Sequence, residues 1–231
     1  MVRFAWATAL ATLLVLALNL NVLDSALKTT TCAQLELEFD SEDFEQSLPD
    51  APALVIGNQR VRYWDLASSP FEAQTYLHRS ASGLNPPLID RCFTRLVGFY
   101  QPSLVVVPID TTYAAMVNQS ELLTALQGII DQRDGYSLNF DLWVIAPITT
   151  PRFELTSRTL LEEIRAAGVQ WAENKFKVQW IDLQDDFLDE ADAADPKLVW
   201  PDGNTLNEAG YQRLTDALVA FQMSVNNNLQ V

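Results

Sequence analysis

The sequence predicts an α/β fold, a flavodoxin-like three-layer sandwich with a five-stranded parallel sheet, preceded by one N-terminal transmembrane helix. Short apolar runs alternate with helical stretches through most of the chain, a pattern typical of a parallel sheet covered by helices on both faces. No Gly-x-Gly-x-x-Gly motif follows an apolar run, which favours a flavodoxin-like sheet over a dinucleotide-binding one. Near the N-terminus, residues 4–23 carry no charge.

The uncharged segment 4–23 is long enough for a membrane anchor. Twenty helical residues span roughly 30 Å, the thickness of a bilayer's hydrocarbon core. Arg3 precedes the segment and Asp24 follows it, which favours a cytoplasmic N-terminus. A cleaved signal peptide and a buried helix are the alternatives, although no clean Ala-x-Ala site follows. We expect an anchor over residues 1–23 and a single-pass protein of the cell membrane, with its domain on the extracytoplasmic (periplasmic) side.

Charge restricts the partners of the remaining chain, which we divide into an acidic tether (24–50) and a domain (51–231). Lys and Arg number 15 against 30 Asp and Glu, a net charge of −15, so nucleic acids and anionic lipid surfaces would be repelled. Eight acidic residues lie between Asp182 and Asp202 without an Asp-x-Asp-x-Asp-Gly loop, and we interpret them as a solvated face. We expect neither a metal nor a cofactor.

Cys32 and Cys92 are the only two cysteines. In an oxidising compartment they could pair, and otherwise they would be free or buried thiols. Two cysteines and one histidine are too few for a zinc site without other ligands.

Five apolar runs are suited to buried strands of a parallel sheet. They are residues 53–57, 75–80, 103–109, 141–147 and 177–182.

Four stretches between and after these runs predict helices. One opens at Asn85-Pro86-Pro87 and keeps a helical apolar period to Tyr100. Ser120 is the expected N-cap of the second, Thr156 or Ser157 starts the third, and the last runs from near Asn207 to about Met223. Ligands of such sheets bind beyond the carboxyl ends of the strands.

Four short segments of the sequence fall in the loops expected at that edge. Gly57-Asn58-Gln59 follows the first run, "HRSASG" with Gly83 follows the second, and "PIDTTY" with Thr112 follows the third. Before the last helix stands "DGNTLNEAGY", which contains Asp202 and Thr205.

In order and spacing these four segments resemble the motifs of the SGNH (GDSL-type) hydrolases. The family has Gly-Asp-Ser, with the nucleophilic serine, where this chain has Gln59, and a catalytic histidine where it has Thr205. The resemblance implies oxyanion or ligand-binding roles for Gln59, Gly83 and Thr112, the last of these at the position of the family's asparagine. Asp202 corresponds to the family's catalytic aspartate.

The two replacements predict a protein without the standard reaction. A serine attacks only when a base accepts its proton, and neither the Gln59 amide nor the Thr205 hydroxyl can replace these groups. We therefore expect a degenerate member that binds or scaffolds acylated envelope glycans or lipids, or a membrane protein partner. The alternatives are an active acyl-ester hydrolase or O-acyltransferase with relocated residues, and an unrelated flavodoxin-like binding domain. His78, the only histidine, is the candidate alternative base, and Ser-x-x-Lys at 25–28 is a weaker pattern.

Overall fold

The computed structural model describes residues 32–45, 47–64 and 75–228. The chain divides into two compact units, Met1–Gln46 and Ser47–Val231. In the first, residues 32–45 are helical, within the segment for which the sequence predicted a tether. The predicted anchor, residues 4–23, lies outside the described residues.

The second unit contains the predicted five-stranded parallel sheet, in the order β2-β1-β3-β4-β5. Every neighbouring pair is parallel, and β1 pairs with β2 along its whole length, from Ala53–Tyr76 to Gly57–Ser80. Each strand lies within the apolar run that predicted it: β1 (Ala53–Gly57), β2 (Tyr76–Ser80), β3 (Leu104–Pro108), β4 (Asp141–Ile145) and β5 (Val178–Ile181).

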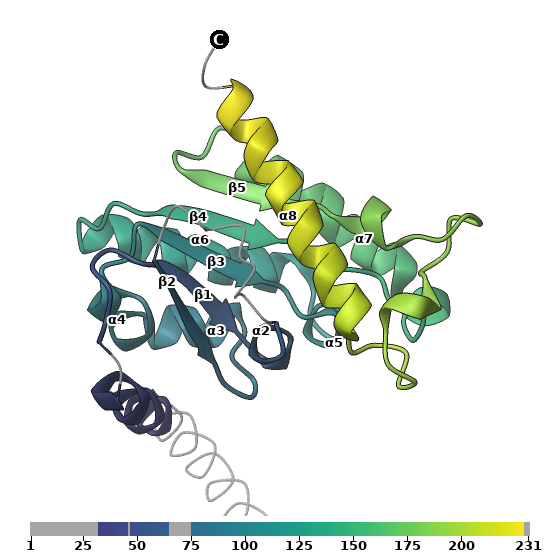
Figure 1. The fold of residues 1–231 in the computed structure, drawn as a ribbon. Coiled ribbons are helices and arrows are strands. Elements are labelled where there is room, and N and C mark those ends of the chain that lie inside the picture. Colours follow the sequence, from purple (N-terminus) through teal and green to yellow (C-terminus); the bar gives the residue numbers. More distant parts are fainter. Residues whose placement is uncertain (1–31, 46, 65–74, 229–231) are drawn as a thin grey trace, which may run out of the picture. The chain divides into compact units, whose positions relative to one another are not determined.

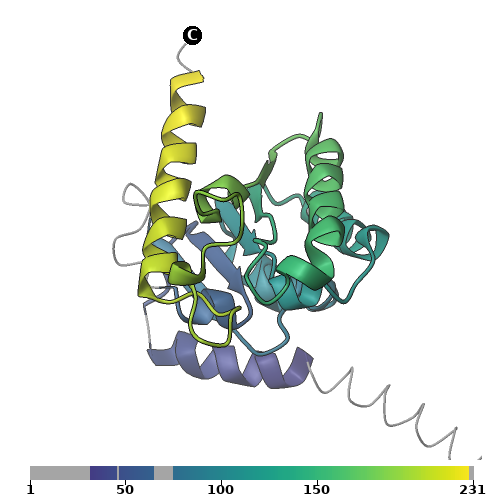
Figure 2. The same cartoon turned by 90° about the vertical axis from the view of Figure 1, so that its right-hand side faces the viewer.

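Helices cover both faces of this sheet, as the alternating pattern predicted. One face carries α8 (Glu208–Asn228) and α2 (Gln59–Arg62), and the other carries α3 (Pro86–Arg91), α6 (Gln119–Gly135) and α7 (Glu154–Ala172) (Figures 1 and 2). Alternate strand residues such as Val55, Val106 and Trp143 pack with Leu214 and Leu218 of α8 in one buried cluster. Because both faces are covered, the inner strands β1 and β3 are apolar and buried along their whole length. The edge strand β2 instead alternates between buried and more exposed residues.

Short elements complete the unit at the ends of the strands. They are α4 (Phe93–Leu96), α5 (Thr111–Ala114) and the 3₁₀ turns η1 (Gly98–Tyr100), η2 (Gln184–Phe187) and η3 (Pro196–Leu198).

The helix predicted from Pro86 to Tyr100 is broken into α3, α4 and η1. Cys92, at φ −102° and ψ 21°, and Val97, at φ −127°, leave helical geometry. The apolar period persisted because each piece still turns buried side chains, including Ile89, Phe93 and Leu96, toward the core. Periodicity reports which side is buried and does not report whether the backbone is continuous.

Two predicted helix starts were displaced by a few residues. The N-cap of α6 is Asn118 rather than Ser120, because the Asn118 side chain accepts the Glu121 N–H at 2.7 Å. Helix α7 starts at Glu154, ahead of Thr156. For α8 the predicted start holds, and the Asn207 side chain accepts the Gly210 N–H at 3.0 Å.

The acidic stretch 182–202 forms turns whose backbone N–H groups are bound by its own carboxylates. Asp189 accepts from Ala191 and Ala193 at 2.8 and 3.1 Å, and Asp195 accepts from Lys197 at 2.9 Å. These bonds give several of the acidic residues a local structural role.

Candidate functional site

The strand order reverses between β1 and β3, where the chain turns first toward β2 and then back across the sheet. The loops that leave β1 and β3 diverge at such a switch point and open a crevice beyond the carboxyl ends of the strands. The sheet topology therefore predicts a binding site in this crevice. Three strand-to-helix loops and the turn before α8 line it.

The loop after β1 places Gln59 at the first position of α2. Asn58 is the N-cap, and its side chain accepts the Arg60 N–H at 3.1 Å. Gly57 allows a close approach of the strand to the helix, because a Cβ there would lie 2.7 Å from Cγ2 of Val61. The Gln59 side chain is exposed, and its N–H belongs to the first helical turn, where N–H groups have no intrahelical acceptor.

The loop after β2 contributes Ser82 and Gly83. Gly83 has φ +73°, a left-handed conformation that L side chains rarely adopt. No neighbouring atom lies within 4 Å of the position its Cβ would take, so the backbone conformation and not crowding requires glycine.

The loop after β3 brings Thr112 to the crevice. Asp110 caps α5 by accepting the Tyr113 N–H at 3.0 Å. The Thr112 hydroxyl accepts from Nδ2 of Asn204 at 3.1 Å. Asn204 therefore supplies a side-chain amide beside the position where the resemblance would place an asparagine.

The turn before α8 is organised around the Asp202 carboxylate. Asp202 Oδ1 accepts the N–H groups of Asn204 and Thr205, both at 2.9 Å, and Oδ2 accepts the Thr205 hydroxyl at 2.5 Å. The Thr205 hydroxyl is the largest cause that lowers the pKa of Asp202 below its usual value. Burial opposes it as the second cause, and the two backbone N–H groups and Arg152 lower the pKa further. The resemblance expects a histidine at the position of Thr205, and a hydroxyl bound to a carboxylate cannot accept a proton near neutral pH.

The four segments converge on one pocket of about 230 Å³. Gln59, Gly83, Thr112 and Thr205 all line it, so the structure brings together the predicted ligand-binding residues. The complete lining is Asn58, Gln59, Arg60, Ser82, Gly83, Asp110, Thr112, Asn204, Thr205, Leu206 and Tyr211.

Three residues of this lining, Arg60, Asn204 and Tyr211, were missed by sequence reasoning. Arg60 is only 7% exposed, and its Nη2 donates to Thr111 Oγ1 at 2.8 Å. Burial is the main cause that raises the pKa of Tyr211 to about 12, so its hydroxyl stays protonated at neutral pH. Asn204 directly precedes Thr205 and could have been considered as a donor, but no sequence pattern placed it against Thr112.

His78 does not line this pocket. Its Nε2 lies 2.7 Å from the Val61 carbonyl oxygen, so this nitrogen carries the proton and donates it. Burial, as the largest cause, lowers the pKa of His78, and its ring is neutral at pH 7. The relocated Ser-His pair that was considered as an alternative has no support in this geometry.

The pocket thus offers hydrogen-bond donors without a nucleophile and base in their expected places. Amide, hydroxyl and guanidinium groups can bind and polarise a carbonyl oxygen. In the part of the chain that the structure describes, no group of three or more His, Cys, Asp or Glu side chains is arranged to hold a metal ion.

A parallel sheet with a pocket at its switch point defines a doubly wound α/β fold. More particularly, solved structures identify the fold of the second unit as that of the SGNH (GDSL-type) hydrolases. A Streptococcus pneumonia protein described as a platelet activating factor is 20% identical and has a TM-score of 0.67, with 89% of this chain and 98% of that chain covered.

Two further structures carry names of the same class. A Bacteroides fragilis protein described as an acylhydrolase is 16% identical, with a TM-score of 0.63 and coverage of 79% and 92% of the two chains. A lipolytic protein of the G-D-S-L family from Desulfitobacterium hafniense is 12% identical, with a TM-score of 0.61 and coverage of 74% and 99%. No family model and no curated protein matches the sequence, and similarity at these identities establishes the fold alone.

Two findings concern the predicted location. Among the described residues, no helix is both long and apolar enough to span a bilayer. Both cysteines are disulfide-bonded, which decides the alternative that the sequence left open between paired and free thiols.

Proposed function

We propose that this protein is a non-catalytic binding domain of SGNH-hydrolase fold, which holds an acylated glycan or lipid of the cell envelope by its ester carbonyl. The observation that carries the proposal is the identity of two side chains in the pocket. Gln59 and Thr205 stand where the resemblance requires a nucleophilic serine and its base, while the pocket itself persists.

The remaining pocket supports binding rather than attack. Loss of a triad nucleophile or base costs on the order of 10⁶ in turnover. Hydrogen-bond donors stay effective without those groups, because they act through fixed dipoles and need no proton transfer. Asn204 and Thr112 add a side-chain pair, linked at 3.1 Å, that can serve as such donors.

The test is hydrolysis of an aryl acetate by the full chain. We expect neither burst nor turnover above a heat-denatured control. The double variant Gln59→Ser/Thr205→His should gain weak hydrolysis, since Asp202 already lies within hydrogen-bonding reach of side chain 205. Each single variant is the matched control and should remain nearly inert, because serine and base act as a unit.

Robust hydrolysis by the unmodified protein would contradict the proposal. If that activity disappeared in His78→Ala, an active hydrolase or O-acyltransferase with relocated residues would replace it. Activity that persisted without His78 would indicate lysine or carboxylate chemistry.

The proposed setting is the extracytoplasmic side of the cell membrane, with residues 4–23 as a single-pass anchor. The uncharged length of that segment supports the anchor. The disulfide-bonded state of Cys32 and Cys92 supports an oxidising compartment. A membrane protein partner remains part of the proposal, because an anchored domain acts beside other membrane proteins.

A further inference from the structure

A larger groove of about 840 Å³ adjoins the small pocket and shares Gln59, Thr205 and Tyr211 with it. Its volume lies within the roughly 300–1,000 Å³ that ligand sites occupy. The lining comes from α2, the turn before α8 and the first turns of α8: Gln59, Tyr63, Trp200, Pro201, Asp202, Thr205, Asn207, Glu208, Tyr211, Gln212 and Thr215.

Two exposed aromatic side chains distinguish this groove. Trp200 is 56% exposed and Tyr63 is 58% exposed, although burying such rings would normally contribute to stability. They come from segments far apart in the sequence and line the same hollow. Flat aromatic faces carry partial negative charge, and the axial C–H bonds of a pyranose ring, which carry partial positive charge, stack favourably on them.

The backbone beneath both rings is held by hydrogen bonds. The Trp200 N–H donates to the Thr205 carbonyl at 2.8 Å, and the Trp200 carbonyl accepts the Gly203 N–H at 2.9 Å. On the other segment, the Tyr63 N–H donates to the Gln59 carbonyl at 3.2 Å. The backbone of both segments is therefore held before a ligand arrives, which limits the part of the ordering cost that comes from the backbone.

A buried side-chain bond fixes α2 against α8, the two helices that line the groove. Trp64 Nε1 donates to Thr215 Oγ1 at 2.8 Å, and that hydroxyl donates to the Tyr211 carbonyl at 2.9 Å. Since Tyr63 directly precedes Trp64, this bond also holds the Tyr63 backbone in place.

Charge narrows the class of ligand. Asp202 and Glu208 are the charged side chains among the described residues of the lining, and both are acidic. A nucleotide, a uronic acid polymer or an anionic lipid headgroup would be repelled. An acyl chain would form no hydrogen bonds with the polar side chains of the lining, such as Gln59 and Glu208, whereas sugar hydroxyl groups can bond with them.

We propose that this groove binds a neutral or amino-substituted glycan, whose sugar rings stack on Trp200 and Tyr63. The shared residues Gln59 and Thr205 direct an ester-linked substituent of that glycan into the small pocket. The inference rests on the proposed function and narrows its ligand from glycan or lipid to glycan.

The test measures binding of three tetrasaccharides to the full chain by saturation-transfer NMR: xylotetraose, chitotetraose and tetragalacturonate. The protein is held in phosphatidylcholine nanodiscs, because glycoside detergents would compete for the site. We expect binding of a neutral or amino tetrasaccharide and none of tetragalacturonate. Trp200→Ala should weaken that binding about tenfold or more, in line with the free energy of a stacked ring.

Phe176→Ala is the matched control, because Phe176 is a 75% exposed aromatic residue that does not line the groove, and its binding should be unchanged. Absence of binding by all three sugars, preference for tetragalacturonate, or equal binding by Trp200→Ala would overturn the inference.

A parallel hydrolysis assay with acetylated xylotetraose separates this inference from the proposed function. Turnover together with Trp200-dependent binding would contradict the non-catalytic function and support the glycan-binding groove. If neither turnover nor sugar binding is observed, the glycan-binding groove is contradicted and the non-catalytic function is not.

Discussion

At the scale of single residues, Thr205 has the clearest physical role in the site. Its hydroxyl donates to the Asp202 carboxylate and cannot exchange a proton near pH 7. Asp202 thereby keeps a structural role, since the same carboxylate holds the N–H groups of Asn204 and Thr205.

Replacement of Thr205 by valine tests this arrangement. Because the Thr205 hydroxyl is the largest cause that lowers the Asp202 pKa, Thr205→Val should raise that pKa toward its usual value of about 3.9. A carboxyl whose folded pKa is lowered stabilises the fold above its unfolded pKa and loses this contribution as pH falls through the folded pKa. The variant should lose part of this contribution.

Carbon-13 NMR titration of the Asp202 carboxyl measures the change. Thr205→Ser is the control and should keep the lowered pKa, because it retains the hydroxyl. An unchanged pKa in the valine variant would show that the backbone N–H groups alone account for the shift.

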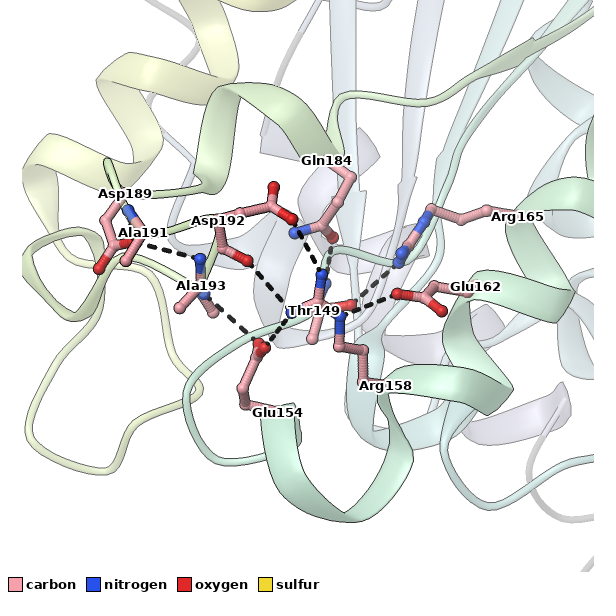
Figure 3. A network of polar contacts seen from close by, with 11 residues as sticks. Thr149, Glu154, Arg158, Glu162, Arg165, Gln184, Asp189, Ala191, Asp192 and Ala193 are labelled. Atoms are coloured by element: carbon pink, nitrogen blue, oxygen red, sulfur yellow. Dashed lines mark hydrogen bonds and ion pairs between the residues drawn. The ribbon is translucent and has the colours of Figure 1, made fainter.

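At the scale of elements, α7 is joined to the loops after β4 and β5 by a polar network (Figure 3). Arg165 is 8% exposed and donates to Thr149 Oγ1 at 3.0 Å and to the Pro147 carbonyl at 3.3 Å, with Asp182 at 3.6 Å. Arg158 lies two turns earlier, is 37% exposed, and pairs with Glu154 and Glu162 of its own helix at 2.6 and 2.8 Å.

The two arginines should therefore differ in their effect on stability. Arg165→Met should lower the free energy of unfolding by about 1–3 kcal/mol, because it leaves buried acceptors without partners. Arg158→Met is the matched control and should change stability little, because its contacts with Glu154, Glu162 and Asp192 are solvent-accessible and such ion pairs contribute little. Urea denaturation of both variants measures the difference, and equal losses would mean that the network does not depend on burial.

Sequence patterns predicted some features of the secondary structure and of the site and not others. Short runs rich in apolar residues predicted all five strands, and β1 and β3 are fully buried because helices cover both faces of the sheet. The edge strand β2 carries His78, Arg79 and Ser80 and alternates in burial. The breaks at Cys92 and Val97 and the N-cap at Asn118 were not predicted, since several local conformations satisfy the same periodicity. Among the site residues, Gln59, Gly83, Thr112 and Thr205 came from the order of four motifs. Arg60 and Tyr211 were missed because burial beside the pocket depends on packing.

At the scale of the whole molecule, membrane fractionation tests the proposed anchor, residues 4–23. Membranes washed at high salt should retain the full chain, because burial of about twenty apolar residues does not depend on charge. The Ser47–Val231 unit should be digested by protease added from outside. A shortened protein released in soluble form would instead indicate a cleaved signal peptide, and resistance to external protease in intact cells would contradict the proposed orientation.

The sequence by itself determined the α/β class, the number and sequence positions of the strands, and the presence of Gln59 and Thr205 at the positions where the resemblance expects a serine and a histidine. These properties follow from local patterns of apolar residues and from the identity of single side chains. Only the tertiary structure decided the strand order, the hydrogen bond between Asn204 and Thr112, the burial of Arg60 beneath the pocket, and the meeting of Tyr63 with Trp200 in one groove. Those features join residues from about fifty to about 140 positions apart. Which side chains meet over such separations depends on how helices pack on the sheet, and no local pattern records it.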